Sequence, residues 1–352
     1  MKKPKNVKKI INTIVSVTCV IISVYLLSDL LSKRFNELLT VLISAGIGVF
    51  LVYVLNSIVH ELGHLISGVI VGLKVYSIEF LGVKLCFDNK LKISYRVSDE
   101  LGNTELIPKN DDKVAKKFVT SSLFGLLATL FLLVGQVLIC LFSKNIIIYS
   151  SLGITFPITA YVFLINLFPV FENNDGYLVY SYLSGGPNKT ITENYFSALY
   201  QLVNGVEPCD LDSSLLVNFN GTKGFSVNVK YLRYLAYIKN DEEGAIKELR
   251  DISDLSKLNS FQNEVFEELF FSAILLKDEK FINSHKEQAV SLFERSERPQ
   301  TFRVHASYRI YNDEKDWAKL ILDSGIKFCD GYVIKGIAKS EKNYMQSMLK
   351  NL

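Results

Sequence analysis

The sequence is poor in cysteine and in net charge, and each shortage excludes a class of protein. Its five cysteines are scattered and form no Cys-x-x-Cys pair, so neither a disulfide framework nor a cysteine zinc site is expected. A formal net charge of +3 is too small and too dispersed to indicate a nucleic-acid-binding surface. Beyond about residue 185 no apolar run is long enough to cross a membrane, which predicts a separate soluble domain there.

The N-terminal half, in contrast, carries four long apolar stretches, at about 10–31, 38–73, 118–142 and 146–168. Each is long enough to cross a bilayer as a helix. A cleaved signal peptide is the alternative for the first, but that stretch is longer than a usual signal core and no Ala-x-Ala-like site follows it. Between the second and third stretches, alternating residues at 74–80 and 90–97 predict the short strands of a small β-hairpin or ribbon.

Basic residues orient the four spans. Clusters of basic residues precede the first and third spans. The first short outer loop has only two basic residues, Lys33 and Arg34. Since basic loops stay in the cytosol, both chain ends are expected there. The residues that carry this inference are Lys2, Lys3, Lys5, Lys8, Lys9, Lys113, Lys116 and Lys117.

Histidine is scarce, yet two of the four histidines stand four residues apart in His60-Glu61-Leu62-Gly63-His64. Imidazoles at this spacing lie on one face of a helix and can bind a single Zn²⁺, while Glu61 can accept a proton from a metal-bound water. The alternative is that His60 and His64 are only polar residues at a helix end near the lipid headgroups. Ionisable residues at membrane depth are costly and usually functional, which favours the metal site.

A catalytic zinc needs a third protein ligand and an open position for water. The end of the fourth span, Asn166-Leu167-Phe168-Pro169-Val170-Phe171-Glu172-Asn173-Asn174-Asp175-Gly176, delivers Asp175 to the same membrane depth as His64. A Pro- and Asn-rich turn leaving the membrane is the alternative for this segment.

These motifs resemble the site-2 protease family of intramembrane zinc metalloproteases, which pair His-Glu-x-x-His with a distant Asn-x-x-Pro and Asp-Gly. The resemblance covers about residues 49–183 and includes the stretches 72–75 and 80–85, which resemble the family's entry into a membrane-associated β-ribbon. It implies that His60, His64 and Asp175 bind zinc, that Glu61 is the general acid/base and that Asn166 stabilises the oxyanion. The gap before Asp175 is about one residue longer than is usual in the family, and Glu172, which falls inside it, is the fallback carboxylate.

The C-terminal half shows amphipathic helical periodicity and a weak repeat of acidic turns at 239–242, 276–279, 311–314 and 338–341. The first three recur at about the spacing of tetratricopeptide-like helical hairpins. Their carboxylates are expected to cap the second helix of each hairpin. His285 and His305 have no partner at ligand spacing and are expected to be surface or packing residues.

Together these patterns predict an α-helical membrane protein of about four transmembrane helices with a small β-ribbon, followed by a soluble all-α, tetratricopeptide-like domain. The expected domains are 1–37, a basic segment and first transmembrane helix; 38–184, a membrane-embedded zinc protease core; and 185–352, a cytosolic repeat-like domain. A composition rich in Lys, Asn and Ile, with few Ala, indicates an AT-rich bacterial genome, so the expected location is a bacterial cell membrane that the chain crosses several times.

The expected activity is that of a zinc metalloendopeptidase acting on membrane-spanning or membrane-associated proteins or peptides. Expected partners are that substrate, the lipid bilayer and a cytosolic protein at the helical domain, with no nucleic acid. Two alternatives stay open. One is a catalytically inactive membrane scaffold of the same fold; the other is a maturation protease for a small secreted peptide or its leader.

Overall fold

The computed structural model describes residues 5–87, 91–95, 102–169, 174–217, 225–238, 241–256, 262–295 and 298–352. It is mostly helical, with a small antiparallel sheet and a helical C-terminal region. The chain divides into two compact units. The first, called here the membrane unit, contains Met1–Lys109 and Lys116–Leu183; the second, the C-terminal unit, contains Asn110–Ala115 and Ser184–Leu352.

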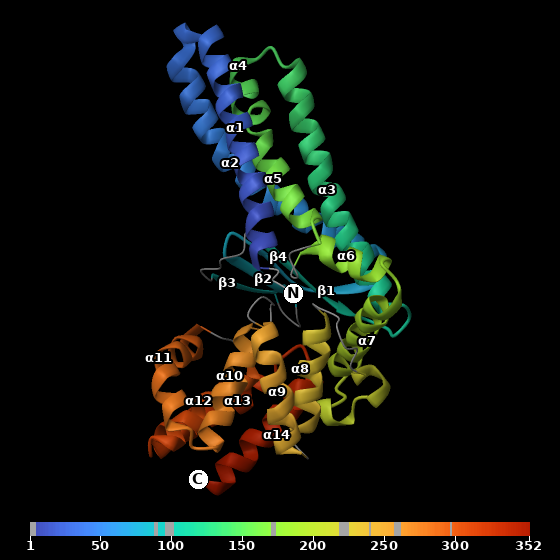
Figure 1. The fold of residues 1–352 in the computed structure, drawn as a ribbon, viewed down its shortest axis with the longest axis vertical. Helices are drawn as coiled ribbons and strands as arrows, with labels where there is room; N and C mark the ends of the chain where they lie inside the picture. Colours follow the sequence, from blue (N-terminus) through green and yellow to red (C-terminus); the bar gives the residue numbers. More distant parts are fainter. Residues whose placement is uncertain are drawn as a thin grey trace. The chain divides into compact units, whose positions relative to one another are not determined.

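Four helical stretches of the membrane unit are long and apolar enough to cross a membrane. The first three are α1 (Lys5–Lys33), α2 (Leu38–Ile70) and α3 (Val114–Phe142), drawn in blue to green in Figure 1. Large apolar side chains on them face outward; Phe131, for example, is 75% exposed and Phe50 is 65% exposed. Apolar surface of this kind is stable in lipid and unfavourable in water, which indicates a membrane protein.

The fourth span is broken, where the sequence predicts one continuous helix. It consists of α4 (Ile146–Ile148), a π-helical turn at Tyr149–Gly153 and α5 (Phe156–Leu167). Pro157 has no backbone N–H, so the helix restarts at that point. Hydroxyl groups satisfy carbonyls around the break: Ser150 donates to the carbonyl of Ile146 at 2.6 Å and Thr155 donates to that of Ser151 at 2.9 Å.

Polar side chains join the fourth span to α2 inside the apolar region. The Asn56 amide donates to Thr159 Oγ1 at 2.9 Å, and the hydroxyl groups of Ser44 and Ser150 are hydrogen-bonded to each other. Gly48 lets the two backbones touch, since a Cβ at this position would lie 2.1 Å from the carbonyl oxygen of Ser151. Such contacts between small and polar residues are typical of helix packing in lipid.

The sheet is larger than the predicted hairpin. Its strands are β1 (Leu73–Phe80), β2 (Val83–Phe87), β3 (Leu91–Tyr95) and β4 (Gly102–Pro108), in the order β3-β2-β1-β4 with antiparallel pairing. Leu81 and Gly82 both have positive φ, 48° and 83°, and form the two-residue turn between β1 and β2. Of the predicted second strand, Lys90, Arg96 and Val97 lie outside the described residues.

Strand β4 lies along α2 and presents alternate residues to it. Gly102 and Thr104 contact Glu61, and the Leu106 side chain fills the space beside Gly68, where a Cβ would come within 2.8 Å. The period of two along a strand places these three residues on one face. The sheet therefore reaches the predicted active-site motif through β4.

The C-terminal unit is helical. After α7 (Gly186–Val203) and two 3₁₀ turns, Pro208–Asp210 and Ser213–Leu216, consecutive helices pack in pairs, as Figure 1 shows in yellow to red. The pairs are α8 (Phe225–Tyr237) with α9 (Glu242–Ser256), α10 (Gln262–Leu275) with α11 (Glu279–Arg295), and α12 (Pro299–Tyr311) with α13 (Lys315–Cys329); α14 (Lys335–Asn351) closes the unit.

The predicted acidic helix caps are confirmed at two of the turns. Asp241 accepts a hydrogen bond from the N–H of Gly244 at 2.9 Å, and Asp278 accepts one from Phe281 at 3.1 Å. At the third turn the position is as predicted, since Glu314 is the N-cap residue of α13, but its side chain makes no capping hydrogen bond. The prediction is wrong at 338–341, which lies inside α14; Lys239 and Asn240 of the first turn lie outside the described residues.

A buried ionic cluster joins α10, α12 and α14. Arg303 donates to Glu268 at 2.6 Å and to Glu341 at 2.7 Å, and its guanidinium lies 4.2 Å from the centre of the Phe271 ring. Tyr234 of α8 donates to Glu268 at 2.6 Å. Glu341 therefore pairs with Arg303 between packed helices, and it does not belong to a turn as the sequence repeat predicts.

Candidate metal centre

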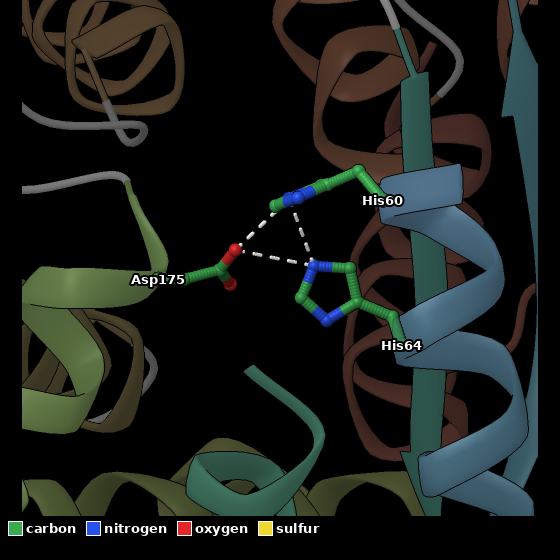
Figure 2. Close-up of side chains that lie close together, drawn as sticks. All are labelled: His60, His64 and Asp175. Atoms are coloured by element: carbon green, nitrogen blue, oxygen red, sulfur yellow. Dashed lines mark hydrogen bonds and ion pairs between the residues drawn. The ribbon is translucent and has the colours of Figure 1, made fainter. Parts of the chain in front are cut away.

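Three side chains from two distant segments meet at one point. His60 and His64 lie on α2, and Asp175 is the first residue of α6 (Asp175–Leu183). Asp175 Oδ2 lies 3.0 Å from His60 Nε2 and 3.2 Å from His64 Nε2, and the two Nε2 atoms lie 3.2 Å apart (Figure 2). The three side chains are 12–13% exposed. The structure thus brings together all three residues that the sequence predicts as ligands.

The size of this triangle suits a small metal ion. With bonds of about 2.0 Å, the ligand atoms of a tetrahedral zinc lie about 3.3 Å from one another. The three observed separations, 3.0 Å, 3.2 Å and 3.2 Å, are within a few tenths of an ångström of that value. In the described part of the chain, these residues form the one group of three His, Cys, Asp or Glu side chains close enough to share a metal ion.

The outer nitrogens of the two imidazoles fix how the rings are protonated. His64 Nδ1 lies 3.1 Å from the carbonyl oxygen of Ser121, which can only accept a hydrogen bond, so Nδ1 carries the proton. His60 Nδ1 lies 2.9 Å from Thr129 Oγ1, whose own proton is directed to the carbonyl of Gly125 at 3.2 Å. In its neutral form each ring therefore directs an Nε2 lone pair at the carboxylate of Asp175.

Two lone pairs and a carboxylate oxygen at this separation repel one another unless positive charge lies between them. When no cation is bound, burial raises the pKa of Asp175, but the positive charge of protonated imidazoles lowers it below its ordinary value, so this side chain is a carboxylate at neutral pH. One divalent cation would satisfy all three donors at once. The donor set, two imidazoles and one carboxylate, suits zinc in particular.

Two glycines let α3 approach the histidines. A Cβ on Gly125 would lie 2.5 Å from Cε1 and from Nε2 of His64, so the ring lies flat against this position. A Cβ on Gly63 would lie 2.6 Å from the carbonyl oxygen of Phe124. The hydroxyl of Ser121 in turn donates to the carbonyl of His64 at 3.0 Å. Both glycines therefore allow close packing of α2 against α3.

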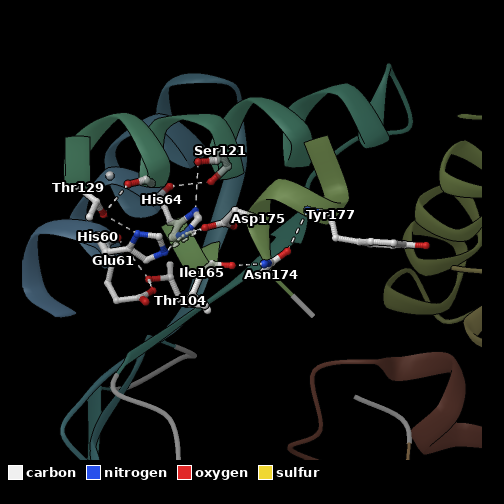
Figure 3. Close-up of polar contacts among 12 residues, drawn as sticks. His60, Glu61, His64, Thr104, Ser121, Thr129, Ile165, Asn174, Asp175 and Tyr177 are labelled. Atoms are coloured by element: carbon white, nitrogen blue, oxygen red, sulfur yellow. Dashed lines mark hydrogen bonds and ion pairs between the residues drawn. The ribbon is translucent and has the colours of Figure 1, made fainter. Parts of the chain in front are cut away.

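Asp175 is positioned by the residues on either side of it. The Asn174 side chain accepts a hydrogen bond from the N–H of Tyr177 at 2.9 Å and donates to the carbonyl of Phe168 at 3.0 Å, as Figure 3 shows in part. A Cβ on Gly176 would lie 2.0 Å from the carbonyl oxygen of Leu167. The start of α6 is therefore held directly against the end of α5, and the ligand between Asn174 and Gly176 has little freedom.

Glu61 follows His60 on α2, about 100° further around the helix. Its carboxylate is buried, at 6% exposure, and its Oε2 accepts a hydrogen bond from Thr104 of β4 at 2.7 Å (Figure 3). Gly102 of the same strand leaves room for the side chain, since a Cβ there would lie 2.7 Å from Glu61 Cγ. The predicted base is thus next to the ligands and clamped between a helix and a strand.

The remaining predicted residues are less constrained. Asn166 lies in the last turn of α5, and within the described residues its side chain makes no hydrogen bond. Its backbone carbonyl faces Gly176, so it lies close to the start of α6, and its role stays a prediction.

Glu172 lies outside the described residues. His285 and His305 stack on Phe281 and Phe293, with ring centres 4.1 Å and 4.5 Å apart, as packing residues.

Four site residues had no assigned role in the sequence: Thr104, Thr129, Ser121 and Asn174. Only Asn174 had a usable signal, because an asparagine three residues before an aromatic at the start of an apolar run is typical of a helix cap. Thr104, Thr129 and Ser121 contact residues that are far from them in the sequence, so no local pattern predicts these contacts.

No protein-family model, curated protein or solved structure matches this chain. The functional inference therefore depends on the site itself.

Proposed function

We propose that this protein is an intramembrane zinc metalloprotease that resembles the site-2 protease family. The observation that carries the proposal is the convergence of two imidazole Nε2 atoms and one carboxylate oxygen within 3.2 Å, beside a buried glutamate and among helices that can span a membrane. His60, His64 and Asp175 would hold the zinc ion and leave a fourth position open.

Each of the remaining residues has a definite task in peptide hydrolysis. When bound, zinc would polarise the attacking water and the scissile carbonyl. The Glu61 carboxylate takes a proton from that water and then gives it to the leaving amine. Asn166 donates a side-chain N–H to the oxyanion that develops on the former carbonyl; such a donor typically contributes about 3 kcal/mol to transition-state stabilisation.

The substrate is a membrane-spanning or membrane-associated polypeptide. A substrate helix must unwind before attack, because its carbonyls are hydrogen-bonded within the helix. The sheet offers partners for the exposed backbone by strand addition. Among the described residues, β3 and β4 each pair on one side only, and β4 is the strand that contacts Glu61. We therefore assign the extended substrate to the free edge of β4.

The C-terminal unit serves as a protein-binding domain in this proposal. Its successive helix pairs and the caps at Asp241 and Asp278 support a tetratricopeptide-like array that recruits or screens substrates. Both chain ends lie in the cytosol of a bacterial cell in this proposal, which the basic residues before the first and third spans support.

The test compares the purified wild-type protein with Glu61→Gln. Both variants should bind about one zinc ion per chain, measured by metal analysis, because the substitution leaves the three ligands in place. Only the wild type should cleave a membrane-tethered reporter. The inactive-scaffold alternative is correct if zinc is absent, or if reporter cleavage is the same in both variants. A proteomic comparison of membranes carrying each variant would separate regulatory membrane proteins from small secreted peptides as substrates.

A further inference from the structure

The buried carboxylate of Glu61 depends on a strand far from it in sequence. Thr104 Oγ1 lies 2.7 Å from Glu61 Oε2 and 3.3 Å from the backbone carbonyl oxygen of Glu61. A carboxylate that is only 6% exposed needs such a donor, because few water molecules can reach it. In the described part of the chain, Thr104 is the hydrogen-bond donor that the structure gives to Oε2.

The strand is fixed so that this hydroxyl faces the helix. Thr104 pairs with Ile78 of β1, and its neighbour Glu105 points to the other face, where it accepts hydrogen bonds from Ser77 and Lys84. Because a shift of one residue would exchange the two faces, these Glu105 contacts on the opposite face fix the register that aims Thr104 at Glu61.

We propose that Thr104 is a positioning residue for the proposed peptidase reaction: its hydroxyl holds Glu61 Oε2 and leaves Oε1 as the oxygen that exchanges the proton. This inference rests on the proposed function. A hydroxyl can donate to Oε2 both when Glu61 is a carboxylate and when Oε1 carries the proton, so the contact persists through the cycle. Glu61, which leaves α2 at an angle to the two histidines, is thereby held in one rotamer throughout.

Gly102 provides the space that this arrangement needs. A Cβ at Gly102 would lie 2.7 Å from Glu61 Cγ and 3.1 Å from Oε1, so Gly102→Ala must displace the carboxylate without removing the Thr104 hydroxyl. This variant perturbs the same contact from a second direction.

The experiment measures kcat, KM and zinc content of the full-length protein for Thr104→Val and Thr104→Ser. Thr104→Val should lower kcat about 10- to 100-fold with unchanged KM and zinc content, which is the scale of losing a partner that orients an active-site side chain. Thr104→Ser should restore most of the activity because it keeps the hydroxyl. Gly102→Ala should lower kcat as Thr104→Val does. The control is Thr190→Val, the same chemical change at an exposed residue of α7 whose hydroxyl bonds only within its helix.

The proposal is overturned if Thr104→Val retains wild-type kcat, if Thr104→Ser is as impaired as Thr104→Val, or if zinc is lost in proportion to activity. Failure of the proposed function looks different. In that case the wild type itself binds no zinc, or Glu61→Gln is as active as the wild type, and the role of Thr104 falls with it.

Discussion

The backbone N–H of Tyr177 donates to Asn174 Oδ1 at 2.9 Å, and this bond caps α6 at the residue before Asp175. The Asn174 amide also donates to the carbonyls of Ile165 and Phe168 at the end of α5, at 2.5 Å and 3.0 Å. One side chain thus fixes where the third ligand begins its helix.

Asn174→Ala should therefore weaken zinc binding, by about 10-fold or more, because losing a partner that orients a ligand typically costs 10- to 100-fold in metal affinity. Competition against a chelator measures the change. Asn174→Asp keeps the capping acceptor but loses both donors and should give an intermediate affinity. Asn204→Ala, at an exposed asparagine that bonds only to the carbonyl of Tyr200, is the control. Unchanged affinity in Asn174→Ala would contradict this account.

Thr129→Val should also lower zinc affinity. Thr129 Oγ1 accepts a hydrogen bond from His60 Nδ1 at 2.9 Å, which keeps the lone pair of Nε2 directed at the metal position. Outer partners of this kind are worth about 10- to 100-fold in affinity. Thr129→Ser should bind zinc nearly as well as the wild type. Equal affinities for the valine and serine variants would mean that the hydroxyl does not orient the ring.

Gly125→Ala should displace His64, since the added methyl would lie 2.5 Å from two atoms of the imidazole. We expect loss of zinc from a protein that still inserts into membranes. Gly135→Ala is a matched control in the same helix, because a Cβ there meets nothing within 4 Å. The two variants can be compared by metal analysis after purification in detergent. If both retain zinc equally, the close approach of α3 does not shape the site.

Glu267 should make the stability of the C-terminal unit depend on pH. Burial raises its pKa to about 7, despite Arg298 at 3.0 Å and the Thr301 hydroxyl. The folded protein therefore binds this proton more tightly than the unfolded chain. The stabilisation is complete below the ordinary pKa of 4.5 and is lost as the pH rises to 7, a change of about 3 kcal/mol at most.

Urea unfolding of the full-length protein tests this prediction through the fluorescence of Trp317, the only tryptophan, which lies in α13. Glu267→Gln should remove the loss of stability between about pH 4.5 and 7, and Glu287→Gln, at an exposed site, should not. His305 opposes the trend below pH 6.5, because burial lowers its pKa to about 4. The comparison is therefore made between variants at each pH. A Glu267→Gln variant with the wild-type pH dependence would refute the assignment.

The sequence predicts the three converging side chains because each is marked by local chemistry. His60 and His64 share a helix face by spacing alone, and Asp175 follows a span that ends at the same depth. The helices that can span the membrane are equally visible, because helices of soluble proteins rarely contain unbroken apolar runs of this length.

The contacts that hold the ligands could not be predicted in the same way. Thr104 reaches Glu61 only through the register of β4 on β1, and Thr129 reaches His60 only through the rotation of α3 about its axis. Neither the register nor the rotation is encoded by a short pattern. The turn between β1 and β2 is also hard to predict from the sequence. Both of its residues, Leu81 and Gly82, have positive φ, and leucine is unusual at such a position.

The separation of the histidines from Asp175 also has a consequence for biogenesis. During synthesis, α2 is complete well before the third and fourth spans and Asp175 have been translated. Until α6 reaches α2, the two imidazoles lack Asp175, so the proposed metal site is incomplete in a newly made chain. In the proposed protease, activity would begin only once the fourth span and α6 are in place, so the order of synthesis would delay it.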